Sequence, residues 1–146
     1  RHLKSENKVI IYKYNGKSEI LFRHLQVVGR LKGLNLGWVY VDELTEVKKS
    51  VWDILLTRLR LNNSNYAFFT TNSDNPNHWL YKEYIEEHEK EYIEKQKIET
   101  DLYTIIAAET LSNIFLPESY LKLINNLSKS DYDRYGAHPF SSRSSK

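Results

Sequence analysis

The clearest hydrophobic pattern in the chain is an unbroken apolar and aromatic run, Trp38 to Val41, that ends at two adjacent acids, Asp42 and Glu43. Such a run is typical of a strand buried on both faces, as in a parallel sheet. Apolar residues at helical spacing follow over about 46–60 and, after a polar break, a second apolar strand covers 66–70. Strand, helix and strand with short connections form a βαβ unit, which is nearly always right-handed with parallel strands.

The rest of the chain contains weaker patterns of the same kinds. Two alternating runs around Asn15-Gly16, over 9–14 and 19–23, predict a β-hairpin at the edge of the sheet. An acidic segment with apolar residues at helical spacing, from Tyr81 to Ile93, predicts a helix with one packed stripe. A strand is expected within 102–107, and a last helix begins at Pro117-Glu118. The fold class predicted from these patterns is α/β.

The paired acids follow the first strand directly, so they leave the sheet at the carboxyl end of that strand. Open α/β sheets bind their ligands at this place. One carboxylate, Asp42, can hold the water shell of Mg²⁺, and the other, Glu43, can orient or deprotonate a nucleophilic water. This is the Walker B pattern, in which a catalytic glutamate follows the magnesium aspartate. The alternative is a buried strand followed by an ordinary helix-capping Asp.

Polar residues also follow the second strand, and the parallel arrangement places them beside the acids. The residues are Thr70, Thr71 and Asn72, in a polar stretch that runs on to Pro76. Their hydroxyls and amide are expected to hydrogen-bond to a phosphate or to hold the attacking water. The alternative is a turn-rich loop without a function of its own.

Composition excludes several other classes. The 146 residues, 40% hydrophobic and 13% aromatic, suffice for one modest core, and the absence of cysteine excludes disulfides and cysteine-based zinc sites. No apolar run approaches the ~20 residues of a membrane span. The net charge of +2 is too small to indicate a nucleic-acid partner. The five histidines show no metal-ligand spacing, and no Ser–His–Asp arrangement is recognisable.

Several short segments, in order and at fixed spacing, resemble one protein family. They are Asn15-Gly16, Ile20 to Arg23, Leu31 to Asn35, Val39 to Glu43, Arg58 to Arg60, Thr70 to Asn72, Asn75-Pro76, His78 to Leu80 and Asn113 to Tyr120. The family is the large terminase subunit of tailed bacteriophages, the ATPase of the DNA-packaging motor, in the branch named after the defective phage PBSX. The resemblance covers about residues 8–135.

The resemblance implies a partial RecA-like P-loop ATPase fold of the additional-strand type, with parallel central strands, an edge hairpin and a helical C-terminal part. Residues 1–135 would be the back part of the ATPase domain, with the sheet core and Walker B over about 8–80 and the helical part over about 81–135. Residues 136–146 would be a polar, disordered tail. The family's phosphate loop, Gly-x-x-x-x-Gly-Lys-Ser/Thr, does not occur among the five glycines, and no acid-rich nuclease segment is present.

The resemblance also implies roles for individual residues in the intact subunit. Asp42 would hold Mg²⁺ and Glu43 would activate water against the γ-phosphate of ATP. The residues Thr70, Thr71 and Asn72 match the family's motif that couples hydrolysis to movement. Without a phosphate loop, neither ATP nor Mg²⁺ is expected to bind tightly to this chain alone.

An arginine finger is also implied, because terminases of this kind supply one from the segment before Walker B. Arg30 lies in a loop between Gly29 and Gly33 and is the candidate, with Arg58 and Arg60 as competitors. The implied partners are double-stranded DNA, the small terminase subunit and the portal protein, with a homo-oligomeric ring in the bacterial host cytoplasm and no membrane. Two alternatives remain at this point: a fragment of another Walker-type ATPase such as a helicase, or an inactive prophage remnant or non-enzymatic interaction module.

Overall fold

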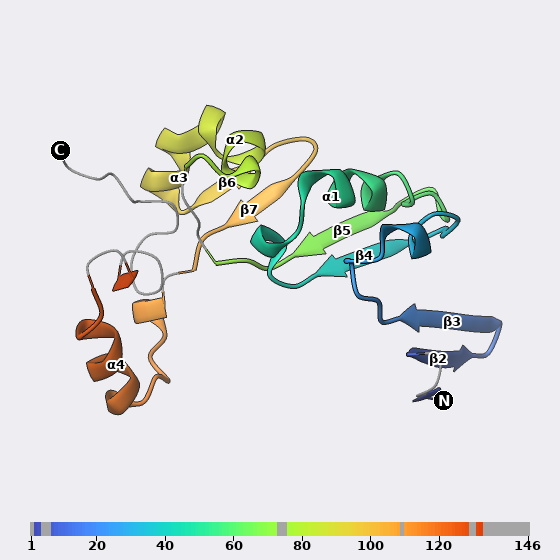
Figure 1. The fold of residues 1–146 in the computed structure, drawn as a ribbon, viewed down its shortest axis with the longest axis horizontal. Coiled ribbons are helices and arrows are strands. Elements are labelled where there is room, and N and C mark those ends of the chain that lie inside the picture. Colours follow the sequence, from blue (N-terminus) through green and yellow to red (C-terminus); the bar gives the residue numbers. More distant parts are fainter. Residues whose placement is uncertain (1, 4–6, 73–75, 109, 129–130, 133–146) are drawn as a thin grey trace.

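The computed structural model describes residues 2–3, 7–72, 76–108, 110–128 and 131–132 (Figure 1). Its centre is a βαβ unit in which β4 (Trp38–Val41) and β5 (Tyr66–Phe69) flank helix α1 (Lys49–Leu56). The two strands pair in parallel, with Trp38 opposite Tyr66 and Val41 opposite Phe69. The predicted parallel βαβ unit is therefore confirmed, with a helix shorter than the 46–60 expected from the apolar spacing.

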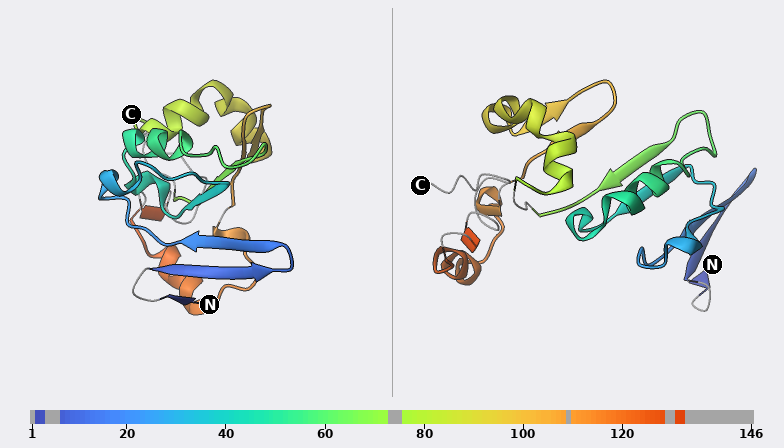
Figure 2. Two further views of the ribbon diagram at one scale, coloured as in Figure 1. Left: turned by 90° about the vertical axis from the view of Figure 1, so that its right-hand side faces the viewer. Right: turned by 45° about the horizontal axis from the view of Figure 1, so that its top comes forward.

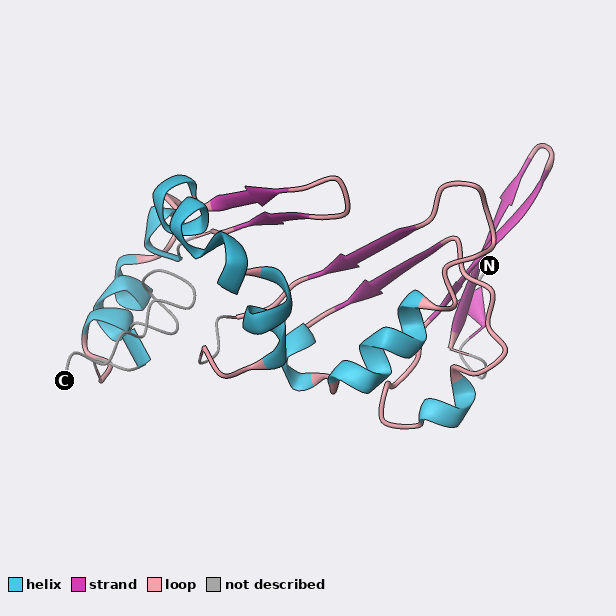
Figure 3. Cartoon of the chain, turned by 90° about the horizontal axis from the view of Figure 1, so that it is seen from above, coloured by secondary structure: helices cyan, strands magenta, loops and turns pink. Residues whose placement is uncertain are grey.

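One face of the β4–β5 pair is packed and the other is not. Helix α1 runs alongside the strands and covers one face (Figure 3), with Val51, Trp52 and Leu55 buried against it. The alternate side chains, which point to the opposite face, are about half exposed, and all are aromatic: Trp38, Tyr40, Tyr66 and Phe68. The prediction of a strand buried on both faces is wrong for the described residues. Large side chains made the run look uniformly buried, although only every second one packs under α1.

The N-terminal strands form a sheet of their own. β2 (Lys8–Lys13) and β3 (Gly16–Leu21) make the predicted antiparallel hairpin, and β1 (His2–Leu3) pairs with β2. The expected position at the edge of the parallel sheet is wrong, because the hairpin bonds to β1 and not to β4 or β5. Figure 2 shows this sheet as a separate layer. Between it and β4 the chain passes through a short 3₁₀ helix, η2 (Val28–Arg30).

The predicted acidic helix is broken into three short pieces. These are α2 (Trp79–Tyr84), the 3₁₀ turn η4 (Glu86–His88) and α3 (Glu89–Lys95). The first break occurs at Ile85, whose φ of −120° lies outside helical geometry, and the second at His88, with φ −115° and ψ 15°. Ile85 is buried, and as an apolar residue it fits the helical spacing of the sequence. The spacing therefore does not reveal that the helix ends there.

A small antiparallel hairpin follows these helices. Its strands are β6 (Lys97–Glu99) and β7 (Thr104–Ile106), and β7 confirms the strand expected within 102–107. β6 was not predicted, so the part after residue 81 is not as helical as expected. A 3₁₀ turn, η5 (Thr110–Ser112), and α4 (Glu118–Asn125) complete the described elements, and α4 confirms the last helix. The polar stretch 136–146 lies outside the described residues.

A single buried cluster joins the βαβ unit to the α2–β7 region. Its members are Leu31, Val41, Leu44, Val51, Trp52, Leu55, Leu80, Tyr81, Ile85, Tyr92 and Ile98. Helix α2 therefore packs directly on the unit that carries the paired acids. Among the described residues, no helix has the length and apolar character needed to cross a bilayer.

Candidate functional site

The paired acids and the Thr-rich segment meet at one edge of the parallel sheet. Asp42 and Glu43 follow β4, whereas Thr70 begins the segment after β5. Because the strands are parallel, both segments emerge at the same edge, as the sequence predicted. Asp42, Glu43 and Thr70 are exposed there.

The first carboxylate is oriented by two hydroxyl groups. The Thr70 hydroxyl donates to Oδ1 of Asp42 at 2.5 Å. The hydroxyl of Tyr40 lies 3.0 Å from Thr70 Oγ1 and 3.3 Å from the same Asp42 oxygen. Tyr40 was not among the site residues predicted from the sequence. The available signal was its position two residues before Asp42 in a strand, which places both side chains on one face.

The second carboxylate, that of Glu43, is held by a side-chain amide. The backbone of Glu43 has an uncommon conformation. Asn72 Nδ2 donates to Glu43 Oε1 and Oε2 at 3.3 Å each. Glu43 itself has φ 53° and ψ 55°, in the left-handed region that costs a non-glycine residue roughly 1 kcal/mol. Backbone bonds from Leu44 N–H to Thr70 O and from Thr70 N–H to Val41 O secure this turn. Strain at a position fixed by its surroundings is a common property of functional sites.

Thr71 makes a different contact from its neighbours. Its half-buried hydroxyl accepts the Thr45 N–H at 3.1 Å and lies 2.8 Å from the Thr45 hydroxyl. Thr45 belongs to η3 (Leu44–Glu46), the short 3₁₀ turn that directly follows Glu43. Thr71 therefore fastens this turn to the end of β5. Its expected contact with a nucleotide stays a prediction.

Arg30 is not brought to the carboxylates of its own chain. It ends η2 and is exposed, and among the described residues no hydrogen bond or ion pair joins its guanidinium to Asp42 or Glu43. Its expected role as a finger in a neighbouring subunit stays a prediction. Of the competing arginines, Arg60 donates from Nε to Asn35 Oδ1 at 2.7 Å and is thereby tied into the fold. Arg58 is half-buried, and its Nε is buried without a hydrogen-bond partner.

The donor set fits a magnesium ion that keeps much of its water. Among the described residues, His, Asp and Glu form no group of three or more that could enclose a metal ion. Mg²⁺ in phosphate-transfer sites is bound by one or two carboxylates, waters and substrate phosphates, and needs no closed protein cage. The oriented, exposed carboxylate of Asp42 meets that requirement, and Glu43 beside it remains available for water.

This structure is thus an α/β protein with paired acids at the end of a parallel strand, facing a Thr-Thr-Asn segment on the next. The family model described as phage terminase large subunit matches residues 1–138, and the chain belongs to this family. The chain is 27% identical over 133 residues to the PBSX phage terminase large subunit of Bacillus subtilis (strain 168). That match covers 84% of this chain and 31% of the relative. Family membership decides against the helicase alternative.

Solved structures show the same fold. The large terminase of the thermophilic bacteriophage D6E superimposes with a TM-score of 0.68 at 15% identity, covering 94% of this chain and 32% of that one. The D6E protein in complex with ATP-γ-S gives a TM-score of 0.65 at 14% identity, covering 92% and 30%. The chain therefore spans about a third of the length of the proteins that it matches.

Proposed function

We propose that this chain supplies the magnesium-binding and water-activating part of the ATP-driven motor that packages phage DNA, within a large terminase subunit. The observation that carries the proposal is the pair of contacts between the ends of parallel strands, Thr70 to Asp42 and Asn72 to Glu43. Family membership and the binding of ATP-γ-S by the D6E large terminase support it. The finer fold proposed with it is a partial RecA-like ATPase domain of the additional-strand type.

In the proposed reaction, Asp42 holds Mg²⁺ and Glu43 acts on the attacking water. The ion, when bound, neutralises and orients the phosphates of ATP. The hydrogen bond from Thr70 holds the Asp42 carboxylate in one orientation, so little order has to be imposed when the ion binds. The Glu43 carboxylate would accept a proton from the water while the water oxygen bonds to the γ-phosphorus. The bond from that phosphorus to the bridging oxygen breaks, and ADP leaves. The Asn72 amide keeps that carboxylate directed to the same edge of the sheet.

Thr70, Thr71 and Asn72 are proposed to couple hydrolysis to movement. Each contacts a different residue of the segment after β4, so the ends of the two strands are joined at three points. Loss of the γ-phosphate changes the charge beside Asp42 and Glu43. The three contacts carry that change to β5 and to the segment that follows it.

Double-stranded DNA, the small terminase subunit and the portal protein are the proposed partners of the intact subunit in the host cytoplasm. A homo-oligomeric ring would place Arg30 of one subunit at the carboxylates of its neighbour, which agrees with the exposure of Arg30.

The proposal is tested by packaging DNA into proheads with a complete large subunit that carries Asp42→Asn. Packaging should be lost, while the variant folds and binds DNA normally, because the neutral amide is a poor ligand for Mg²⁺. The matched control is Glu46→Gln, a neutralised exposed acid of the same turn, which should package normally. Normal packaging by Asp42→Asn would overturn the proposal and favour a non-enzymatic interaction module.

A further inference from the structure

The turn that follows Glu43 is held at both of its ends. At its start, Thr45 is bonded to Thr71, and the Leu44 N–H donates to the carbonyl of Thr70. At its end, Val47 leaves η3 in an extended conformation, with φ −101° and ψ 131°. Because Glu43 is the left-handed residue that begins this turn, any shift of the turn re-aims its carboxylate.

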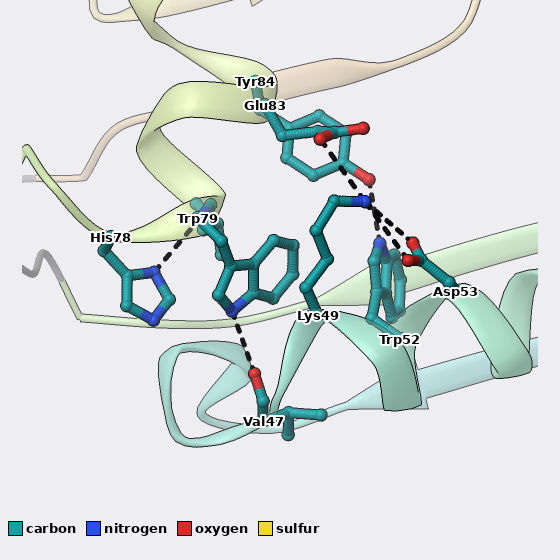
Figure 4. Close-up of polar contacts among 9 residues, drawn as sticks. Val47, Lys49, Trp52, Asp53, His78, Trp79, Glu83 and Tyr84 are labelled. Carbon is teal, nitrogen blue, oxygen red and sulfur yellow. Dashed lines mark hydrogen bonds and ion pairs between the residues drawn. The ribbon is translucent and has the colours of Figure 1, made fainter.

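The end of the turn is held by a side chain from helix α2. The indole Nε1–H of Trp79 donates to the carbonyl oxygen of Val47 at 3.0 Å (Figure 4). Trp79 is the first residue of α2, and His78 caps that helix by accepting the Leu80 N–H on Nδ1 at 3.2 Å. The helix end and the indole are therefore ordered together. Figure 4 shows the indole pointing from α2 toward the turn.

Helix α2 has a fixed position of its own on the βαβ unit. Trp52 of α1 donates from Nε1 to the Tyr84 hydroxyl at 2.8 Å, and Tyr84 also packs on Phe69 of β5. Lys49 Nζ bridges the helices, 3.0 Å from Asp53 Oδ1 in α1 and 3.4 Å from Glu83 Oε2 in α2 (Figure 4). These contacts fasten α2 to α1 but do not touch the turn after Glu43.

We propose that Trp79 is a positioning residue for Glu43. The donor on its indole anchors the Val47 carbonyl, and this anchor, with the Thr45–Thr71 contact, holds Glu43 at the angle that activates water. The inference rests on the proposed ATPase function and deepens it, because it connects helix α2 to the catalytic carboxylate. A displacement of α2 would move the Val47 carbonyl and thereby withdraw Glu43 from the water.

The test is Trp79→Phe in a complete large subunit, because phenylalanine keeps an aromatic ring but removes the donor. A misplacement of about 1 Å can cost about 100-fold in rate. Because the Thr45–Thr71 contact still holds the other end of the turn, we expect a smaller shift and a fall in kcat for ATP of about tenfold. The KM for ATP should stay within about twofold, because the indole does not touch the proposed nucleotide site. The matched control is Tyr84→Phe, which removes the hydroxyl that accepts from Trp52. It should leave kcat unchanged within about twofold, because the ring contact with Phe69 and the Lys49–Glu83 bridge still hold α2 in place.

A second pair of variants separates positioning from folding. In a Glu43→Gln background, adding Trp79→Phe should change the residual turnover less than about twofold, because the carboxylate that it positions is already gone. Equal losses of kcat in Trp79→Phe and Tyr84→Phe, or additive losses in the double variant, would overturn the inference. If Glu43→Gln itself leaves turnover intact, the proposed function fails. If Glu43→Gln abolishes turnover but Trp79→Phe keeps full kcat, only the role of Trp79 fails.

Discussion

The hydroxyl of Thr70 lies 2.5 Å from Oδ1 of Asp42, although 28 positions separate the two residues in the sequence. The parallel register explains the meeting. Val41 stands opposite Phe69, so the next residue of each strand leaves the sheet side by side. The polar segment that follows β5 thereby supplies a hydrogen-bond donor to the acid that follows β4.

Replacing Thr70 by valine should therefore weaken the response to Mg²⁺. Valine has nearly the shape of threonine but lacks the hydroxyl, so the Asp42 carboxylate loses a charge-assisted hydrogen bond. In an exposed setting we expect about a tenfold rise in the Mg²⁺ concentration needed for half-maximal ATP turnover by the complete subunit. Thr70→Ser keeps the hydroxyl and is the matched control. Identical Mg²⁺ titrations for the valine and serine variants would contradict the assigned role.

Arg30→Ala should abolish ATP turnover, because the site of the neighbouring subunit then lacks its arginine. In the assembled motor we expect a loss of about 10³-fold or more, the range measured for arginine fingers, with ATP binding preserved. Lys32→Ala, an exposed cation two positions further on, should be neutral.

Mixed assemblies make the test for Arg30 sharper. Combining Arg30→Ala subunits with Glu43→Gln subunits should restore part of the turnover, because some interfaces then contain both intact residues. No recovery on mixing would show that Arg30 does not act across subunits.

Stability should depend strongly on Trp52, the aromatic centre of the core. Trp52 is 3% exposed, meets Phe69 edge-on at 6.0 Å between ring centroids, and bonds to Tyr84. Trp52→Ala should lower the free energy of unfolding by about 3–5 kcal/mol, as measured by urea denaturation followed by circular dichroism. Leu56→Ala, four residues further along α1 and 37% exposed, should cost far less. An equal loss of unfolding free energy in both variants would contradict the central place of Trp52 in the core.

Alkaline pH should destabilise the α2–α3 region through Tyr92. Burial raises the pKa of Tyr92 to about 12, because the phenolate is poorly solvated there. Unfolding restores a pKa near 10, so the unfolded chain releases this proton more readily and stability falls between pH 10 and 12. Thermal melting between pH 8 and 12 should show this fall, and Tyr92→Phe should reduce it. Tyr14→Phe, a change at a fully exposed tyrosine, should leave the fall as it is; equal effects of both changes would rule out Tyr92 as its source.

The parallel βαβ unit and the placement of the acids could be predicted from the sequence because each depends on local patterns. Two apolar runs, a helical spacing between them and polar residues after each run are sufficient to bring Asp42 and Thr70 to one edge. The exposed face of the strands could not be predicted, because the large aromatic side chains of Trp38 and Tyr40 continue the hydrophobic run without a polar break, although both are about half exposed.

Other features depend on tertiary contacts that leave no local pattern. β6 is three residues long with a charged residue at each end. It follows Gln96, whose left-handed conformation ends α3, and it pairs with β7. Tyr40 and Trp79 join the site through a hydroxyl and an indole donor whose partners lie in other segments. The register of the strands brings Tyr40 to Thr70, and the packing of α2 brings Trp79 to Val47.

The most direct test of the account is ATP hydrolysis by a complete large subunit that carries Glu43→Gln. Glutamine keeps the shape of the side chain but cannot take a proton from water. We predict a fall in kcat of at least about 10²-fold, with the Kd for ATP and Mg²⁺ within about threefold of the unmodified subunit. A Glu43→Gln subunit that hydrolyses ATP at the normal rate would contradict the claim that the acids after β4 are the catalytic end of this site.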